Sequence, residues 1–115
     1  MACEDDVRRI CLSLPEATEK PWGGLPGFRV RNKVFARIRQ KPDALLVMRS
    51  DVYEKESSIG SEPEKFFQTP QYEGNPAVLV RLQAIDVDEL EEFLTESWAL
   101  CAPARLVAGF EAGRT

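Results

Sequence analysis

Apolar side chains near the start of the chain recur at steps of three and four residues. This spacing predicts a helix over about residues 4–14, with its acidic first turn offsetting the positive end of the helix dipole. Pro15 follows directly, and the residue before a proline is driven out of helical geometry, so the helix is expected to end there. The apolar stripe consists of Val7, Ile10, Cys11 and Leu14.

The pattern then changes from helical spacing to alternation. Residues 20–27 are rich in glycine and proline and predict a loop, and the segments 28–31 and 34–39 predict a β-hairpin joined at Asn32-Lys33. Strand alternation should separate the hairpin into two faces. One is expected to carry Phe28, Val30, Val34, Ala36 and Ile38, and the other Arg29, Arg31, Phe35, Arg37 and Arg39.

The middle of the chain gives shorter signals. A third strand is expected over residues 44–49, after a loop at 41–43, and Asp51 with Glu54 has the spacing of a capping box for a short helix. A second capping pattern at residues 61–64 predicts a turn of helix. Further expected features are Phe66 and Phe67 on that turn, an extended segment 69–72, a turn at 73–76, and a strand 77–82 that places Arg81 with Ala77 and Leu79.

The last helix has the clearest start signal. Asp86 is the expected N-cap, Glu89 completes a capping box, and Ile85 has the position of a hydrophobic staple. Pro103 interrupts the helix, and residues 104–110 predict a final turn. The apolar stripe that should cover the sheet comprises Leu90, Phe93, Leu94, Trp98 and Cys101.

These elements follow in the order α-β-β-β-α-β-β-α, which predicts a two-layer α+β sandwich. Short hairpins favour a mainly antiparallel sheet, with the helices on one face and part of the other face open to water. The chain has 115 residues, 43% hydrophobic and 30% charged, as is typical of one globular domain. A single domain is therefore expected over residues 1–115.

Composition narrows the classes of function. The sequence contains no histidine, and its three cysteines, Cys3, Cys11 and Cys101, have no metal-ligand or redox-motif spacing. We therefore expect no enzyme, no catalytic or metal site and no cofactor. The apolar runs are too short for a membrane span, and the first residues are acidic where a signal peptide is basic. These features favour a cytoplasmic protein without a membrane partner.

Several segments together resemble the MmcQ/YjbR family. They are Cys11-Leu12-Ser13-Leu14-Pro15-Glu16-Ala17-Thr18-Glu19, then Phe28-Arg29-Val30-Arg31-Asn32-Lys33-Val34-Phe35-Ala36, then residues 66–82, and the closing helix Asp88 to Cys101. The resemblance implies a CyaY-like (frataxin-like) α+β fold, a proposed role in DNA binding through a "double wing" surface, and no enzymatic activity. The chain departs from the family at Gln71-Tyr72, where many relatives carry a histidine, and at residues 76–80, so no role of that histidine carries over.

Charge is unevenly distributed along the chain. Its net charge is −4, but between residues 28 and 49 seven basic residues accompany a single acidic one, Asp43. Arginine binds phosphate oxygens in pairs and an exposed aromatic ring can stack on a base, so this segment predicts a nucleic-acid-binding face with DNA as the candidate partner. The alternative is a solvated sheet face with no ligand. The candidate residues are Arg29, Arg31, Lys33, Phe35, Arg37, Arg39 and Arg81.

Two alternatives come from other classes of function. A metal-handling, frataxin-like role would use the carboxylates of the last helix, which otherwise form a solvated helix face: Asp86, Asp88, Glu89, Glu91, Glu92 and Glu96. A protein-interaction role would use Trp22, which stands beside flexible glycines; the alternative is a tryptophan that fills the edge of the core. The protein partner stays open, and a monomer or weak dimer is expected.

Overall fold

The computed structural model describes residues 2–22, 25–39, 44–48, 52–70, 74 and 76–114. The helices are α1 (Glu4–Ser13), α2 (Val52–Ser61), α3 (Val87–Cys101) and α4 (Ala104–Arg114), with a 3-10 turn at Leu82–Ala84. The strands are β1 (Ala17–Trp22), β2 (Leu25–Val30), β3 (Lys33–Arg39), β4 (Ala44–Met48), β5 (Phe66–Phe67) and β6 (Ala77–Arg81).

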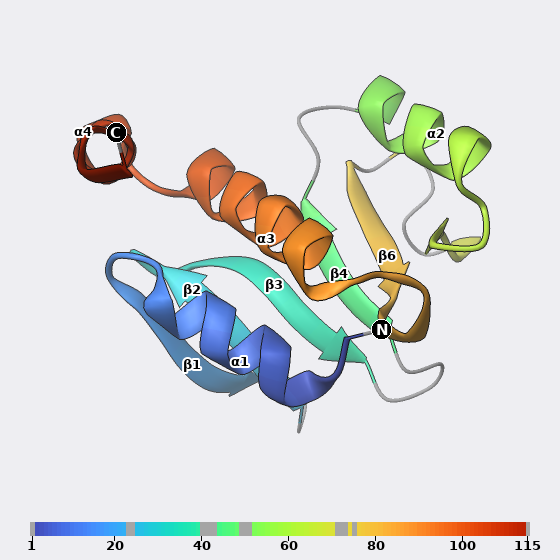
Figure 1. Ribbon diagram of the computed structural model, residues 1–115, viewed down its shortest axis with the longest axis horizontal. Coiled ribbons are helices and arrows are strands. Elements are labelled where there is room, and N and C mark those ends of the chain that lie inside the picture. Colours follow the sequence, from blue (N-terminus) through green and yellow to red (C-terminus); the bar gives the residue numbers. More distant parts are fainter. Residues whose placement is uncertain are drawn as a thin grey trace.

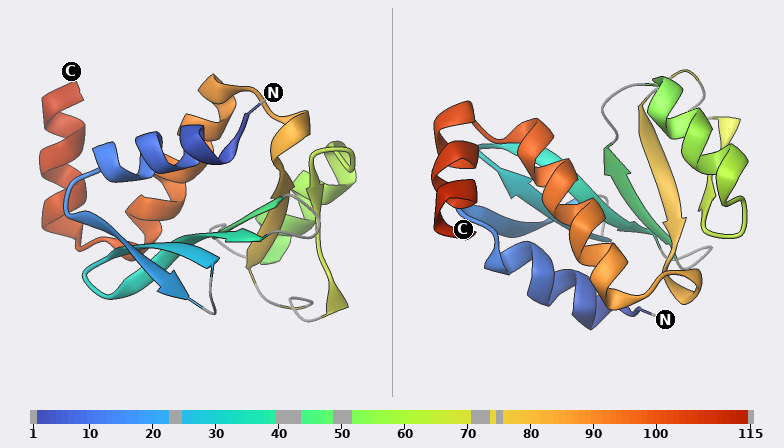
Figure 2. Two further views of the ribbon diagram at one scale, coloured as in Figure 1. Left: turned by 90° about the horizontal axis from the view of Figure 1, so that it is seen from below. Right: turned by 45° about the horizontal axis from the view of Figure 1, so that its top comes forward.

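The strands form one antiparallel sheet in the order β1-β2-β3-β4-β6-β5 (Figure 1). Helices α1 and α3 lie across one face of this sheet, as the edge-on view on the left of Figure 2 shows. Helix α2 contacts β5 and β6, and α4 stands at the end of the sheet where β1 begins. The predicted two-layer α+β architecture is confirmed. We call the face covered by α1 and α3 the helix face and the opposite one the outer face.

The main core fills the space between the sheet and the two covering helices. The predicted stripe of α1 is buried there, and so are Leu90, Leu94 and Trp98 from α3. The strands contribute alternate residues, such as Phe28 and Val30 from β2. The Trp98 indole nitrogen donates a hydrogen bond to the Pro15 carbonyl oxygen at 3.0 Å. This bond satisfies the polar atom of the buried ring and joins α3 to the end of α1.

Strand β1 was not predicted. Residues 20–22, expected in a loop, complete β1, and residues 25–27 begin β2, so only the glycines between them connect the two strands. Proline usually indicates a break in a strand, but β1 is an edge strand, where the missing N–H of Pro21 costs no bond in the sheet. Those glycines, the loop at 41–43, Asp51 and residues 71–73 lie outside the described residues.

Strand β5 replaces the predicted helical turn at Phe66 and Phe67. Phe66 pairs with Val80 and is buried in the main core, where its ring meets the Phe93 ring edge-on at 5.1 Å between centroids. Phe67 packs instead with a second cluster on the outer face. Two consecutive aromatic residues that face opposite ways are typical of a strand, since helical neighbours would lie only 100° apart.

The β2–β3 hairpin forms, but its turn is shifted by one residue. Arg31 and Asn32 are the two turn residues, with φ of 49° and 70°, and Val30 pairs with Lys33. Two positive φ angles are what a two-residue turn of type I′ requires. Arg31 therefore belongs to the turn, although the alternating pattern placed it in the strand.

Phe35 is a β-bulge, and its predicted position on the arginine face is wrong. Phe28 pairs with Ala36 but Arg29 pairs with Val34, which leaves Phe35 as the extra residue. Its side chain is 1% exposed and belongs to the main core. The Phe35 carbonyl oxygen accepts a hydrogen bond from the Ser97 hydroxyl of α3 at 2.5 Å. The extra residue breaks the alternation, so faces assigned by counting residues fail at this point.

The outer face is less open than the sequence predicted. Ala44, Ala77 and Leu79 are buried there and, with Phe67, form a second apolar cluster over β4, β5 and β6. Val78 and Val80 point to the main core at the same time. A strand that is apolar on both sides is typical of burial on both faces of a sheet. Only the β1–β3 half of the outer face follows the predicted polar pattern.

The hydrogen bond from the Ser97 hydroxyl to the Phe35 carbonyl oxygen should contribute measurably to stability. Substitution Ser97→Ala should lower the free energy of unfolding by about 1–3 kcal/mol, because the buried Phe35 carbonyl oxygen loses the Ser97 hydroxyl. Urea denaturation followed by circular dichroism measures this change. Ser58→Ala is the matched control, since the Ser58 hydroxyl bonds a carbonyl of its own exposed helix and its loss should cost far less. Equal stabilities of the two variants would contradict the assigned role of Ser97.

The second cluster gives the next prediction. Leu79 is only 2% exposed, so Leu79→Ala should destabilise the protein by about 2–5 kcal/mol, the range for a buried leucine. Leu100→Ala is the control, because Leu100 is 47% exposed and its loss should cost less than about 0.5 kcal/mol. The same urea experiment compares the two. A Leu79→Ala variant as stable as the control would show an outer face that is open over β6.

Candidate nucleic-acid interface

Arg29 lies on the outer face in β2, between two residues that point into the core. It is half-buried, and its backbone pairs with Thr18 of β1. The Nε atom is buried and makes no hydrogen bond within the part of the chain that the structure describes. A guanidinium group carries five N–H donors and has no acceptor atom. Arg29 thus retains donors that an anion can satisfy.

Arg37 lies on the same face of the neighbouring strand. It stands between Ala36 and Ile38, which are both buried in the main core, and its backbone pairs with Gly27. Arg29 is two residues from Gly27 along β2. Standard strand spacing and rise then separate the Arg29 and Arg37 Cα atoms by about 8 Å. The two arginines are neighbours on one face, as alternation predicts.

Arg81 is the third member of this set. It ends β6 on the outer face, and its guanidinium carbon lies 4.1 Å from the centre of the Phe67 ring. Such stacking holds the guanidinium against the face of the ring. The register places the Arg81 Cα atom about 12 Å from that of Arg37, on the side away from Arg29. The three arginines therefore follow a diagonal across the outer face.

The remaining predicted residues do not join this diagonal. Arg31 lies in the hairpin turn, where its Nε and Nη2 atoms donate to the two Glu16 carboxylate oxygens at 2.5 and 2.9 Å. Lys33 is exposed opposite Val30, a residue of the helix face. Phe35 is in the core. For Arg39 only the backbone is described, and it pairs with Ala44.

Lys20 is a basic residue of the outer face that the sequence analysis missed. It is exposed in β1, and its backbone pairs with Gly27, which pairs in turn with Arg37. The alternation of Ala17 and Glu19 with Thr18 and Lys20 was a strand signal. It was too short to outweigh the proline and glycines that follow.

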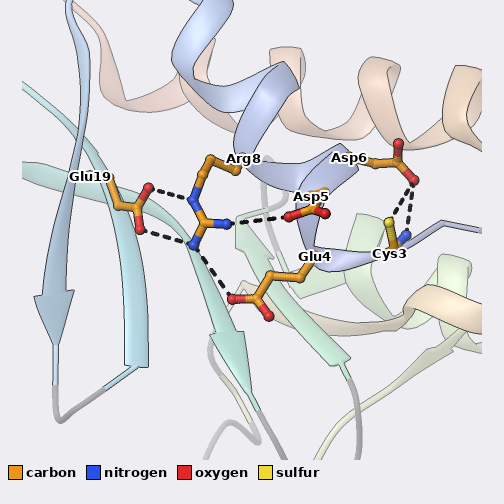
Figure 3. A network of polar contacts seen from close by, with 6 residues as sticks. All are labelled: Cys3, Glu4, Asp5, Asp6, Arg8 and Glu19. Atoms are coloured by element: carbon orange, nitrogen blue, oxygen red, sulfur yellow. Dashed lines mark hydrogen bonds and ion pairs between the residues drawn. The ribbon is translucent and has the colours of Figure 1, made fainter.

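The acidic residue of the described strands lies on the helix face of the sheet. Glu19 is the only acidic residue in the six strands, and it pairs with Phe28 on the helix face. Figure 3 shows that Arg8 of α1 donates to both Glu19 oxygens, at 2.8 and 3.2 Å, and also lies near Glu4 and Asp5. Glu19 raises the pKa of Arg8 by this contact. The outer face of the described strands therefore carries positive side chains and no carboxylate.

The first turn of α1 uses another carboxylate for capping. Asp6 accepts a hydrogen bond from the Cys3 backbone N–H at 3.0 Å, also drawn in Figure 3. This bond lowers the pKa of Asp6, because the ionised carboxylate is the better acceptor. Cys11 lies below in the core, and burial raises the pKa of its thiol, which is typical of an unreactive cysteine.

The acidic residues at the start and along the surface of α3 are the candidates of the metal-handling alternative. Asp86 caps the helix by accepting the Glu89 N–H at 2.8 Å, and Glu89 pairs with Lys65 at 2.6 Å. Across the described ranges, no three histidine, cysteine or acidic side chains gather closely enough to hold a metal ion. The other acidic residues line an open groove of about 490 Å³ with Glu111 of α4: Asp88, Glu91, Glu92 and Glu96.

The tryptophan of the protein-interaction alternative ends β1, where its backbone pairs with Leu25. The adjoining Gly23 and Gly24 lie outside the described residues, so a contact made by this loop stays a prediction.

Among the described helices, none has both the length and the apolar character needed to cross a bilayer.

Comparison with known proteins gives the family and the fold. The YjbR family model matches residues 12–100. Uncharacterized protein Rv2570 of Mycobacterium tuberculosis and Uncharacterized protein Mb2600 of Mycobacterium bovis are each 38% identical to this chain over 127 residues, covering 96% of both sequences. The crystal structure of Deinococcus radiodurans protein DR2400, with the family-model domain DUF419, superposes with a TM-score of 0.74 at 24% identity, over 87% of this chain and 78% of that one. The family model and the curated relatives extend over most of the sequence, and the chain belongs to the YjbR family.

Proposed function

We propose that this protein binds the phosphate backbone of nucleic acid, with DNA as the candidate partner, through the outer face of its sheet. The groups that make contact are Lys20, Arg29, Arg37 and Arg81. The observation that carries the proposal is the environment of Arg29: its guanidinium is half-buried, its buried Nε lacks a hydrogen bond within the described residues, and the described strands carry no carboxylate on this face. A bound phosphate would supply the negative charge that no carboxylate of the described strands supplies to this guanidinium.

Phosphate recognition fits the geometry better than base recognition. One arginine guanidinium can donate two parallel hydrogen bonds to two oxygens of the same phosphate. Contacts to phosphate position a protein on nucleic acid but do not recognise its base sequence. Stacking on bases needs a free aromatic ring. Phe35 is buried in the core, and the Phe67 ring is covered by Arg81. We therefore infer binding that depends on charge and spacing and only weakly on base sequence.

The overall charge sets the strength and the orientation of this binding. The chain carries a net charge of −4, so the molecule as a whole repels a polyanion. Attraction exceeds repulsion only when the outer face meets the ligand and the acidic helix layer points away. We propose a binding protein of modest affinity that performs no chemical step, in keeping with a sequence that lacks histidine.

The test is the salt dependence of DNA binding. Four phosphate contacts predict a slope between about −3 and −4 in a plot of log K against log salt concentration. Arg29→Gln and Arg37→Gln should each weaken binding and reduce the slope by about one. Fluorescence anisotropy with labelled duplex and single-stranded oligonucleotides at low salt measures both quantities.

Arg9→Gln is the matched control. Arg9 is an exposed arginine of α1, paired with Asp6 on the helix side, so this variant makes the same change of net charge away from the outer face. It should leave the slope unchanged. The proposal fails if neither oligonucleotide binds at low salt, or if Arg9→Gln weakens binding as much as Arg29→Gln does.

A further inference from the structure

Glu16 and Arg31 form an ion pair at the end of the sheet, where β1 begins and the β2–β3 hairpin turns. They stand one step beyond the Ala17–Val30 pair, so they extend the β1–β2 register. Both residues have left-handed backbone conformations, with φ of 57° and 49°. This conformation is uncommon for residues other than glycine, aspartate and asparagine. The Glu16 carboxylate and the Arg31 guanidinium thus meet although each residue adopts an unfavourable backbone conformation.

The pair is well formed but open to solvent. Arg31 donates to both carboxylate oxygens of Glu16, and the two side chains are 47% and 46% exposed. Exposed ion pairs contribute little net stability, since water and salt compete for both charges. An external anion with the same two-oxygen geometry can therefore replace the Glu16 carboxylate without unfolding the turn.

A second arginine acts on the same carboxylate. The Arg31 guanidinium is the main cause that lowers the pKa of Glu16, and the positive charge of Arg105 adds to the effect. Arg105 lies in the first turn of α4. Arg31 is therefore the direct partner of the Glu16 carboxylate, and Arg105 adds only a weaker electrostatic effect.

We propose that Arg31 forms a phosphate subsite in which the Glu16 carboxylate is an intramolecular substitute for the ligand. The occupant is a backbone phosphate of the nucleic acid held by the outer face, so this inference rests on the proposed function. Arg31 follows Arg29 by two residues, about 7 Å along the strand direction. The subsite thus lies beyond Arg29, at the end of the sheet where the β2–β3 hairpin turns.

Exchange at this subsite conserves the hydrogen bonds of Arg31. The phosphate accepts the two N–H groups that Glu16 accepts in the free protein, and the Glu16 carboxylate moves into solvent. Binding has to displace Glu16 first, so Glu16 lowers the affinity of the protein for its ligand. This competition is the property that separates a subsite from an ion pair with a purely structural role.

The ion pair itself is testable without a ligand. The ¹³C carboxyl signal of Glu16 should titrate below the ordinary value of 4.5, because Arg31 lowers its pKa, and Arg31→Gln should move the midpoint back toward that value. A carboxyl group whose pKa is lowered on folding contributes stability above its unfolded-state pKa and loses it as the pH falls through the folded-state pKa. A midpoint that Arg31→Gln leaves unchanged would contradict the pair and the subsite together.

The decisive experiment is Glu16→Gln in the oligonucleotide-binding assay. The variant should bind several-fold more tightly than the wild-type protein, with a log–log salt slope steeper by about one because a further phosphate is engaged. Adding Arg31→Gln to Glu16→Gln should abolish the gain. Glu19→Gln is the matched control: it removes the carboxylate of another two-bond arginine–glutamate pair, on the helix face, and makes the same change of net charge.

The outcomes separate this inference from the proposed function. If the wild-type protein binds in a manner that depends on Arg29 and Arg37, but Glu16→Gln gives no gain, the subsite is overturned and the outer-face function stands. An equal gain for Glu19→Gln, or a gain that persists without Arg31, also overturns the subsite, because net charge then explains it. If neither the wild-type protein nor Glu16→Gln binds, both proposals fail.

Discussion

The hydrogen bond from Ser97 to the Phe35 carbonyl joins the two layers at the β-bulge of β3, where the pairing of β2 with β3 shifts register. Without the extra residue in β3, strict alternation would carry Phe35 to the same face as Arg37. With it, Phe35 enters the core, and its carbonyl oxygen accepts a hydrogen bond from Ser97 of α3. The bulge thus removes the aromatic ring from the outer face while Arg29 and Arg37 stay there. The chemistry of that face, cationic without a free phenylalanine ring, is a consequence of a packing requirement on the opposite side.

The sheet also separates the charges of the molecule. Glu19 is turned to the helix side, where Arg8 neutralises it, and the other carboxylates of α1 and α3 lie in the helical layer. A chain with an overall negative charge therefore presents one positive face. This separation of charge orients the protein as it approaches a polyanion, since the attraction acts only when the positive face is turned toward it.

The sequence predicted those elements whose signals are local and strong. The stripes of α1 and α3, the hairpin and the alternation of β6 each follow from a regular spacing, and the structure contains all of them. Prediction from the sequence failed where a contact between distant residues determines the local structure. Pro21 is tolerated because β1 is an edge strand, and Phe66 is extended because it pairs with Val80. Phe35 lies in a bulge whose carbonyl oxygen bonds to Ser97 of α3. For the site, alternation correctly placed Arg29, Arg37 and Arg81 together; it could not show that Arg31 would turn toward Glu16, a partner fifteen residues earlier in the chain.

Arg29 and Arg31 are two residues apart, yet of the two only Arg31 is paired with a carboxylate among the described residues. Arg31 receives a carboxylate through two left-handed turns, although an exposed pair of this kind adds little to stability. Arg29, which is more deeply buried and would benefit more from a partner, has no ion pair within the described part of the chain. Selection for stability alone would favour the reverse arrangement, because an uncompensated buried donor is costly and an exposed one is not. A ligand that supplies its own anions to Arg29, and that competes with Glu16 for Arg31, explains both positions with one cause.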